Sequence, residues 1–377
     1  MIADATDRKR NVVTPSCLVT TNASAPDLTF PRLKRPILLV GNFLSSTHKV
    51  LDVCEELAGQ LVASGWPVFT TSSKPERLPR MLDMINTAWS KRHQYAAAQV
   101  DVYSGAAFLW AEAVCWMLRR AGKPYILTLH GGGLPDFARS WPRRVRYLLR
   151  YAVVVTTPSL FLLEKMAPYR SDLVLLPNAL DLSAYAFRAR QRPQLHLIWL
   201  RAFSAIYNPS LAPRVLARLK QDFPDVRLTM IGPDKEDGSL QEMQQVATEL
   251  GVMDLISLPG GVPKGEVPDW MNKGDIFLNT TNIDNAPVSV LEAMACGLNV
   301  VSTNVGGIPY LLRHQQDALL VPPNDSQAMA AAVRRIYTEP GLSERLSVNG
   351  RATANQFDWS AILPQWEALL SAVADGH

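Results

Sequence analysis

Cysteine is scarce in this sequence, and the four cysteines of the 377-residue chain are scattered along it. They are Cys17, Cys54, Cys115 and Cys296. Their spacing matches neither a disulfide framework nor a metal-binding knuckle, so we expect free thiols in a reducing, cytoplasmic environment. No run of about 18 or more apolar residues occurs, so no membrane-spanning helix is expected. The first residues also lack an apolar signal core, and export is therefore not expected.

Several well-known catalytic motifs are missing as well. The fingerprint G-x-G-x-x-G is absent, which argues against a dinucleotide-dependent dehydrogenase. The chain has no Walker loop, no H-E-x-x-H and no G-x-S-x-G, the motifs of P-loop, zincin and α/β-hydrolase sites. It also lacks a D-x-D motif and a cluster of metal-ligating side chains, so we expect no bound metal.

Charge is unevenly distributed along the chain. Residues 1–190 hold 24 Lys+Arg and 14 Asp+Glu, a net charge of +10, whereas residues 191–377 hold 14 and 20, a net charge of −6. The basic first half favours an anionic partner. No nucleic-acid-binding motif accompanies it, so nucleic acid is not expected to be that partner.

The most informative stretch is Asn285 to Gly307, NAPVSVLEAMACGLNVVSTNVGG. Pro287 suits the first turn of a helix, and Gly297 suits its end because glycine adopts the left-handed conformation at little cost. The β-branched run Asn299–Thr303 then predicts a buried parallel strand. The stretch therefore indicates a helix, a tight turn, a buried strand and a glycine loop.

Two acids accompany this helix, Asp284 before its start and Glu292 in its second turn. The free N–H groups and partial positive charge of a helix N-terminus favour a phosphate, which we expect near Asn285, Val288 and Ser289. Acids on either side of a phosphate suit the hydroxyls of two sugars, so the pattern indicates a sugar nucleotide. The alternative is that Asp284 is an ordinary loop acid and Glu292 a solvated helix position.

Short apolar strands alternate with helices from Pro36 to a last helix expected over Ile362–Val373, which is typical of parallel α/β sheets. In such sheets ligands bind at the carboxyl ends of the strands. Gly41 follows the first strand and His130 ends the strand that begins at Pro124, so both are candidate ligand-facing residues. The alternatives are an ordinary strand-to-helix turn at Gly41 and a satisfied turn histidine at His130.

Asp284, Glu292, the run Ala293-Met294-Ala295-Cys296-Gly297 and the pair Gly306-Gly307 together resemble the donor-site signature of glycosyltransferase family 4. Members of this family have the GT-B fold, in which two Rossmann-like domains face a cleft and a C-terminal helix crosses back to the first domain. The resemblance implies a retaining transferase that uses a nucleotide sugar without a required metal. It also implies that Glu292 holds the ribose.

The resemblance implies roles for five further residues. Arg201, at the end of a predicted strand, would neutralise the donor diphosphate. Asp284 would hold hydroxyls of the donor sugar, and His130 would reach that sugar from the other domain. Gly232 and Val262 would line the slot for the nucleobase.

The sequence departs from the family pattern at several positions. Asp284 stands where glutamate is usual, and Ser45-Ser46 stands where the family has a Gly-Gly pair. The family's lysine after Arg201 is missing, because Tyr207-Asn208-Pro209 occupies that position and the next lysine is Lys220. One cation of the diphosphate clamp is therefore expected to be absent.

We expect a flexible leader over residues 1–30 and a Rossmann-like acceptor domain over residues 31–190. A Rossmann-like donor domain is expected over residues 191–358, followed by a crossover helix and tail over residues 359–377.

The segment Arg139 to Tyr151, RSWPRRVRYLLRY, interleaves five arginines with apolar and aromatic side chains. A basic amphipathic helix there would bind an anionic membrane surface and place the protein peripherally at the inner face of the membrane. The alternative is a solvated helix that covers the sheet.

These observations predict a hexosyltransferase-like enzyme of class EC 2.4. It would move a sugar from a UDP- or GDP-sugar to a glycan, lipid-linked or other acceptor with retention of anomeric configuration. Two other hypotheses stay open. One is a non-catalytic nucleotide-sugar-binding protein on a GT-B scaffold, and the other is a sugar-nucleotide epimerase, which would react without an acceptor.

Overall fold

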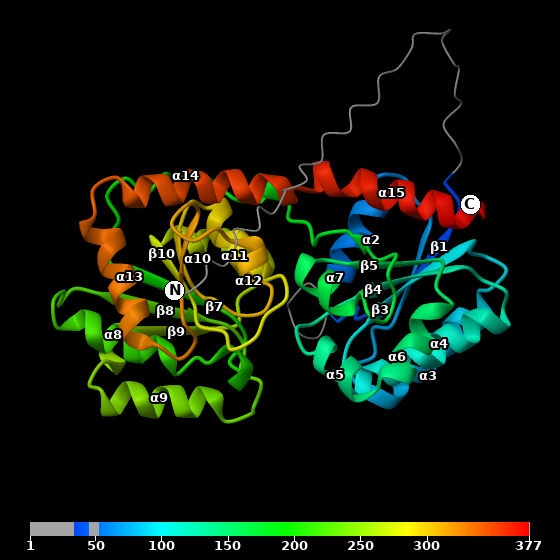
Figure 1. The fold of residues 1–377 in the computed structure, drawn as a ribbon, viewed down its shortest axis with the longest axis horizontal. Coiled ribbons are helices and arrows are strands. Elements are labelled where there is room, and N and C mark those ends of the chain that lie inside the picture. Colours follow the sequence, from blue (N-terminus) through cyan, green and yellow to red (C-terminus); the bar gives the residue numbers. More distant parts are fainter. Residues whose placement is uncertain (1–33, 45–52, 377) are drawn as a thin grey trace, which may run out of the picture. The chain divides into compact units, whose positions relative to one another are not determined.

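The computed structural model describes residues 34–44 and 53–376, and every structural statement below concerns these ranges. Within them the chain forms two six-stranded parallel sheets, each flanked by helices (Figure 1). This confirms the predicted α/β class with two Rossmann-like sheets. The leader expected over residues 1–30 and the pair Ser45-Ser46 lie outside the described residues.

The first sheet has the strand order β2-β1-β3-β4-β5-β6. Its strands are β1 (Ile37–Val40), β2 (Val68–Thr71), β3 (Ala97–Val102), β4 (Tyr125–Leu129), β5 (Val154–Thr157) and β6 (Val174–Leu175). The helices of this part of the chain are α2 (Val53–Ala63), α3 (Arg77–Ser90), α4 (Phe108–Arg120), α5 (Leu134–Ser140), α6 (Pro142–Arg150) and α7 (Leu160–Met166).

Strand β1 shows how helices cover both faces of this sheet. Leu38 and Val40 pack with α3 and α4, whereas Ile37 and Leu39 pack with α2 and the last helix, α15 (Trp359–Asp375). All four side chains are buried, as expected for a parallel strand between two helical layers. The predicted C-terminal helix therefore does return to the first sheet.

The second sheet has the order β12-β11-β10-β7-β8-β9. Its strands are β7 (His196–Leu200), β8 (Arg227–Ile231), β9 (Ile256–Gly260), β10 (Ile276–Asn279), β11 (Asn299–Thr303) and β12 (Ala318–Val321). The helices around it are α8 (Leu211–Lys220), α9 (Ser239–Glu249), α10 (Val267–Asn272), α11 (Val288–Ala295), α12 (Ile308–Leu311), α13 (Ser326–Thr338) and α14 (Leu342–Ala354). One face of the sheet packs against α8, α9 and α13, and the other packs against α10, α11 and α12.

The strand order of the second sheet reverses between β7 and β10. The chain winds outward from β7 to β9, then returns to the other side of β7 and winds outward through β12. Loops that follow the two central strands leave in opposite directions, which opens a crevice at their carboxyl ends. Topology alone therefore places a ligand site next to Arg201, after β7, and the loop 280–287, after β10.

The central stretch of the sequence folds as predicted. Helix α11 follows Pro287, and Gly297 ends it with a φ of +81°. Strand β11 spans the predicted residues and is fully buried. The stretch thus places the N-terminus of α11 and the carboxyl end of β11 at the crevice.

The segment Arg139–Tyr151 is not one helix, contrary to the prediction. Helix α5 ends at Ser140, Trp141 leaves the helical conformation with φ −129° and ψ 54°, and α6 begins at Pro142. Proline disfavours the helical conformation of the residue before it, which explains the break. Among the described helices, none has the length and apolarity that crossing a bilayer requires. The expected domain limits at residues 190 and 358 stay predictions.

Candidate active site

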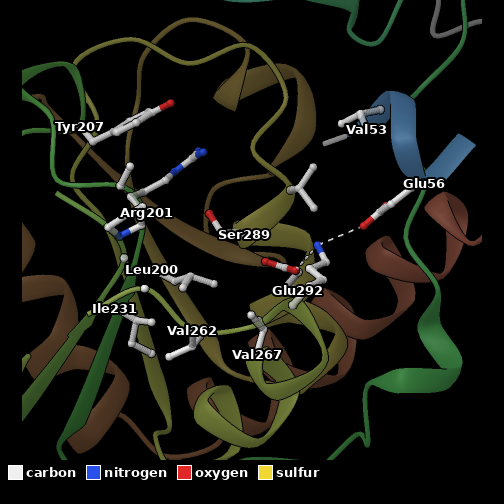
Figure 2. A pocket seen from close by; sticks show the side chains of 16 residues that line it. Val53, Glu56, Leu200, Arg201, Tyr207, Ile231, Val262, Val267, Ser289 and Glu292 are labelled. Atoms are coloured by element: carbon white, nitrogen blue, oxygen red, sulfur yellow. Dashed lines mark hydrogen bonds and ion pairs between the residues drawn. The ribbon is translucent and has the colours of Figure 1, made fainter. Parts of the chain in front are cut away.

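A cavity of about 250 Å³ lies at the crevice of the second sheet (Figure 2). Six of the ten residues that the sequence assigns to a donor site line it, namely Arg201, Gly232, Val262, Val288, Ser289 and Glu292. The first three follow the carboxyl ends of β7, β8 and β9. The last three lie on α11, which begins at the same edge of the sheet.

One end of the cavity carries polar groups without partners. Ser289 is buried, and its Oγ has no hydrogen-bond partner within the described ranges. The Nε of Arg201 is buried without a partner in the same sense. Buried polar groups are normally paired because leaving them unpaired costs about 1–3 kcal/mol each. Together with the free N–H groups at the start of α11, they suit an anionic group such as a phosphate.

The guanidinium group of Arg201 is held from two sides. It forms an ion pair with Asp284 and lies over the Tyr207 ring, 4.7 Å from the ring centre. Figure 2 shows Arg201 and Tyr207 side by side at one end of the cavity. Asp284 does not line the cavity itself, and it is connected to it through Arg201.

An apolar part of the cavity begins at Gly232. This glycine has a φ of +152°, and a Cβ atom there would overlap the carbonyl oxygen of Arg201. Only glycine therefore fits where β7 and β8 end side by side. Val262 and Val267 continue the wall, which suits a flat apolar ring.

Glu292 is a buried carboxylate with two partners. Its Oε1 accepts a hydrogen bond of 2.8 Å from the Tyr185 hydroxyl and one of 2.7 Å from Lys264 Nζ. Burial, and next the charge of Glu292, raise the pKa of Tyr185, which keeps its hydroxyl a donor. Glu292 is thus not a solvated helix position.

Lys264 is a cation of this cavity that the sequence did not reveal. Its Nζ lies 2.7 Å from Glu292 and 3.5 Å from Glu56 of α2. Burial would lower the pKa of Lys264, but the two carboxylates outweigh it and raise that pKa, so the lysine stays charged. Lys264 follows β9, and its position after a parallel strand was the one available signal.

His130 does not line the donor cavity. Its Nε2 lies 3.0 Å from Asp101 Oδ1, and its ring stacks on Tyr103 at 4.9 Å. It borders a separate cavity of about 20 Å³ together with Thr128 and Gln99. The role of His130 at the donor sugar stays a prediction.

Gly41 and Asn285 are also away from the cavity lining. A Cβ atom on Gly41 would lie 2.6 Å from Asp101 Oδ2 and 2.7 Å from Cys54 Sγ, so packing alone explains this glycine. The Asn285 side chain accepts a hydrogen bond from Ser159 Oγ, the N-cap of α7. Within the described ranges, no group of three or more His, Cys, Asp or Glu side chains is arranged to hold a metal ion.

Residues 190–353 match the family model of the group 1 glycosyl transferases. This segment is similar to the group 1 glycosyl transferases. It contains Arg201, Lys264, Asp284, Ser289 and Glu292, so the whole polar lining contributed by the second sheet belongs to the matched region.

Similarity to known proteins extends beyond residues 190–353. The D-inositol 3-phosphate glycosyltransferase of Thermobispora bispora is 26% identical over 171 residues, which is 44% of this chain and 40% of that protein. The enzyme of the same name from Pseudarthrobacter chlorophenolicus is 23% identical over 283 residues, 71% of this chain and 67% of that protein. The match thus spans two fifths of one relative and two thirds of the other.

A solved structure establishes the fold. Anabaena Alr3699/HepE, in complex with UDP and glucose, superposes with a TM-score of 0.72 at 18% identity, covering 90% of this chain and all of that one. The fold is GT-B, as predicted from the sequence.

Proposed function

We propose that this protein is a nucleotide-sugar-dependent glycosyltransferase whose donor binds in the cavity at the start of α11. The observation that carries the proposal is that two buried groups beside a helix N-terminus, Ser289 Oγ and Arg201 Nε, have no partner among the described residues. A diphosphate would give both groups a partner. The apolar wall at Val262 would take the base, and Glu292 would take the ribose.

The chemistry of transfer follows from charge. When the bond between sugar and diphosphate breaks, negative charge develops on the leaving phosphate. Arg201 and the free N–H groups of α11 are placed to stabilise that charge. The proposed retention of configuration follows the family resemblance, and the leaving phosphate would then accept the proton of the acceptor hydroxyl.

The acceptor would enter from the first sheet. The glycine loop after β4 packs closely against the donor loop, because a Cβ atom on Gly132 would lie 3.0 Å from Ile283 and 3.3 Å from the backbone of Asp284. His130 adjoins this loop and would approach the donor sugar from it. Two relatives are named for an inositol phosphate acceptor, so an anionic, glycan or lipid-linked hydroxyl is the acceptor class that we propose.

The alternative of a non-catalytic binding protein rests on one observation. Arg201 is already paired with Asp284, so a donor must compete with an internal carboxylate for this cation. A binding protein and a transferase would both be stabilised by the donor, whereas only a transferase would release nucleoside diphosphate when an acceptor is added. An epimerase would convert the donor without an acceptor.

A peripheral membrane position remains part of the proposal. On α6, Arg143, Arg146 and Arg150 are exposed, while Val145 and Leu149 face the core. The exposed arginines would bind an anionic membrane surface at the cytoplasmic side. Sedimentation with phosphatidylglycerol vesicles, against phosphatidylcholine vesicles, tests this. Binding that persists after all three arginines are changed to glutamine would contradict it.

The donor site is tested by thermal unfolding against a panel of UDP-, GDP-, ADP- and dTDP-sugars. A ligand that binds only the folded state raises the melting temperature by mass action. We expect one sugar nucleotide to stabilise the wild type. The variant Glu292→Gln should lose that shift, and Glu249→Gln, on the exposed side of α9, should keep it. Absence of a shift for every sugar nucleotide at millimolar concentration would contradict the proposed function.

A further inference from the structure

The cation missing after Arg201 has a counterpart elsewhere in the chain. Lys264 reaches the donor cavity from the turn that follows β9, and its side chain is 29% exposed. Its ammonium group lies 2.7 Å from Glu292 and 3.5 Å from Glu56. Figure 2 shows both of these carboxylates away from Arg201, which lies at the other end of the cavity. Lys264 therefore does not occupy the place of a second phosphate ligand beside Arg201.

The contacts of Lys264 and Glu292 leave hydrogen-bonding capacity toward the cavity. An ammonium group has three N–H donors, and the described contacts of Lys264 go to two carboxylates, Glu292 and Glu56. Glu292 accepts the hydrogen bonds from Tyr185 and Lys264 on the same oxygen, Oε1. Its Oε2 has no hydrogen-bond partner within the described ranges and can accept a hydrogen bond from a ligand. The pair thus presents one acceptor and one donor side by side.

The phosphate end of the cavity and Glu292 lie within one turn of the same helix. Ser289, at the phosphate end, precedes Glu292 by three residues on α11, a rise of about 4.5 Å on the same helix face. Val262 and Val267 form the apolar wall. Glu292 and Lys264 therefore lie about one helical turn from the phosphate end, within reach of a sugar attached to that phosphate.

We propose that Lys264 is a specificity-determining residue that reads the ribose cis-diol together with Glu292. Glu292 Oε2 accepts from one hydroxyl, and Lys264 donates to the other. A 2′-deoxyribose would leave one of these two charged groups without its partner, so a site of this kind rejects it. This inference rests on the proposed function, because it assigns a ligand group to the same cavity.

The inference is tested with the nucleoside diphosphate that the panel selects and with its 2′-deoxy counterpart, such as UDP with dUDP or GDP with dGDP. Calorimetric titration gives both affinities for the wild type and for Lys264→Met, Lys264→Arg and Glu56→Gln. We expect the wild type to favour the ribonucleotide by about 10- to 100-fold, the value of one hydrogen bond to a charged group. Lys264→Met should reduce this ratio to about threefold or less, whereas Glu56→Gln should leave it unchanged.

Each other outcome overturns the inference in a recognisable way. If Lys264→Met lowers the affinity for both nucleotides by the same factor, the lysine contributes only its charge to binding. If Glu56→Gln lowers the preference for the ribonucleotide as much as Lys264→Met does, the lysine acts through its ion pair with Glu56 of α2. Melting temperatures measured without ligand show whether Lys264→Met is folded. The variant Lys264→Arg keeps the charge and a donor, so it should retain part of the preference for the ribonucleotide. If the wild type binds both nucleotides with equal affinity, this inference alone is overturned. If the wild type binds neither nucleotide, the proposed function is overturned together with it.

Discussion

Arg201 and Asp284 form an ion pair, although the sequence assigns them to different parts of a donor and separates them by 83 residues. The two residues follow β7 and β10, the central strands between which the sheet order reverses. Both side chains are largely buried, with 16% and 12% of the side chain exposed. A diphosphate in the cavity would therefore compete with Asp284 for the arginine.

This competition predicts opposite effects of two substitutions. Arg201→Ala should weaken binding of the free nucleoside diphosphate by about 10- to 100-fold, because a charge-assisted hydrogen bond is lost. Asp284→Asn should not weaken that binding, because it removes the competing carboxylate, but it should lower the rate of sugar transfer. Asp222→Asn, which breaks an exposed ion pair with Arg334, is the control and should change neither quantity. Weaker diphosphate binding by Asp284→Asn would contradict the competition.

A second prediction concerns the unpartnered hydroxyl of Ser289. Ser289→Ala should lower the affinity for the nucleoside diphosphate by about three- to tenfold, the value of one neutral hydrogen bond, and should leave the unliganded protein at least as stable as before. Ser347 is the matched control, because its buried hydroxyl donates a 2.6 Å bond to the carbonyl of Gly297. Ser347→Ala should reduce the free energy of unfolding by about 1–2 kcal/mol. Urea unfolding and calorimetric titration measure the two quantities, and a Ser289→Ala variant that loses stability but not affinity would contradict the assignment.

Gly307 gives a third prediction. A Cβ atom there would overlap the carbonyl oxygen of Asn285, so Gly307→Ala must move the loop that leads into α11. We expect it to lower the free energy of unfolding by about 1–3 kcal/mol and to weaken donor binding. Gly59→Ala is the matched control in exposed space on α2, and it should stabilise the protein by about 0.5–1 kcal/mol. Equal effects of the two substitutions would show that the close approach at Gly307 is not needed.

The pH dependence of stability provides a fourth prediction. Burial lowers the pKa of His196, whose Nε2 lies 3.0 Å from Thr229 Oγ1. The unfolded chain therefore binds this proton more readily than the folded chain does. The resulting stability is fully present above about pH 6.5, the ordinary pKa of histidine, and is lost as the pH falls from there through the folded pKa. Urea unfolding at pH 7.5 and pH 5.5 should show a smaller loss on acidification for His196→Gln than for the wild type, and an equal loss would contradict this assignment.

Much of the site could be predicted because it is local in sequence. Helix α11 and strand β11 could be predicted from the spacing of apolar residues and from Pro287 and Gly297. The parallel sheet then brings the carboxyl ends of its strands together at one edge. Arg201 could be placed for the same reason. These are features that a short window of residues determines.

The rest depends on contacts between distant segments, which spacing does not encode. Lys264 and Tyr185 meet Glu292 from 28 and 107 residues away, and neither lies in a recognisable motif. Helix α14 was not predicted from the sequence, and its Asn349-Gly350 pair is a combination typical of a turn. In the structure α14 packs on α11, and a Cβ atom at Gly350 would make only ordinary van der Waals contact with Met294.

The central claim is that the cavity at α11 binds a sugar nucleotide through Glu292. Calorimetric titration of the stabilising sugar nucleotide into the wild type, Glu292→Gln and Glu249→Gln tests it most directly. The account predicts binding with one site per chain to the wild type and Glu249→Gln, and a loss of at least about tenfold in Glu292→Gln. Equal affinity in all three proteins would contradict it, because the donor would then bind elsewhere.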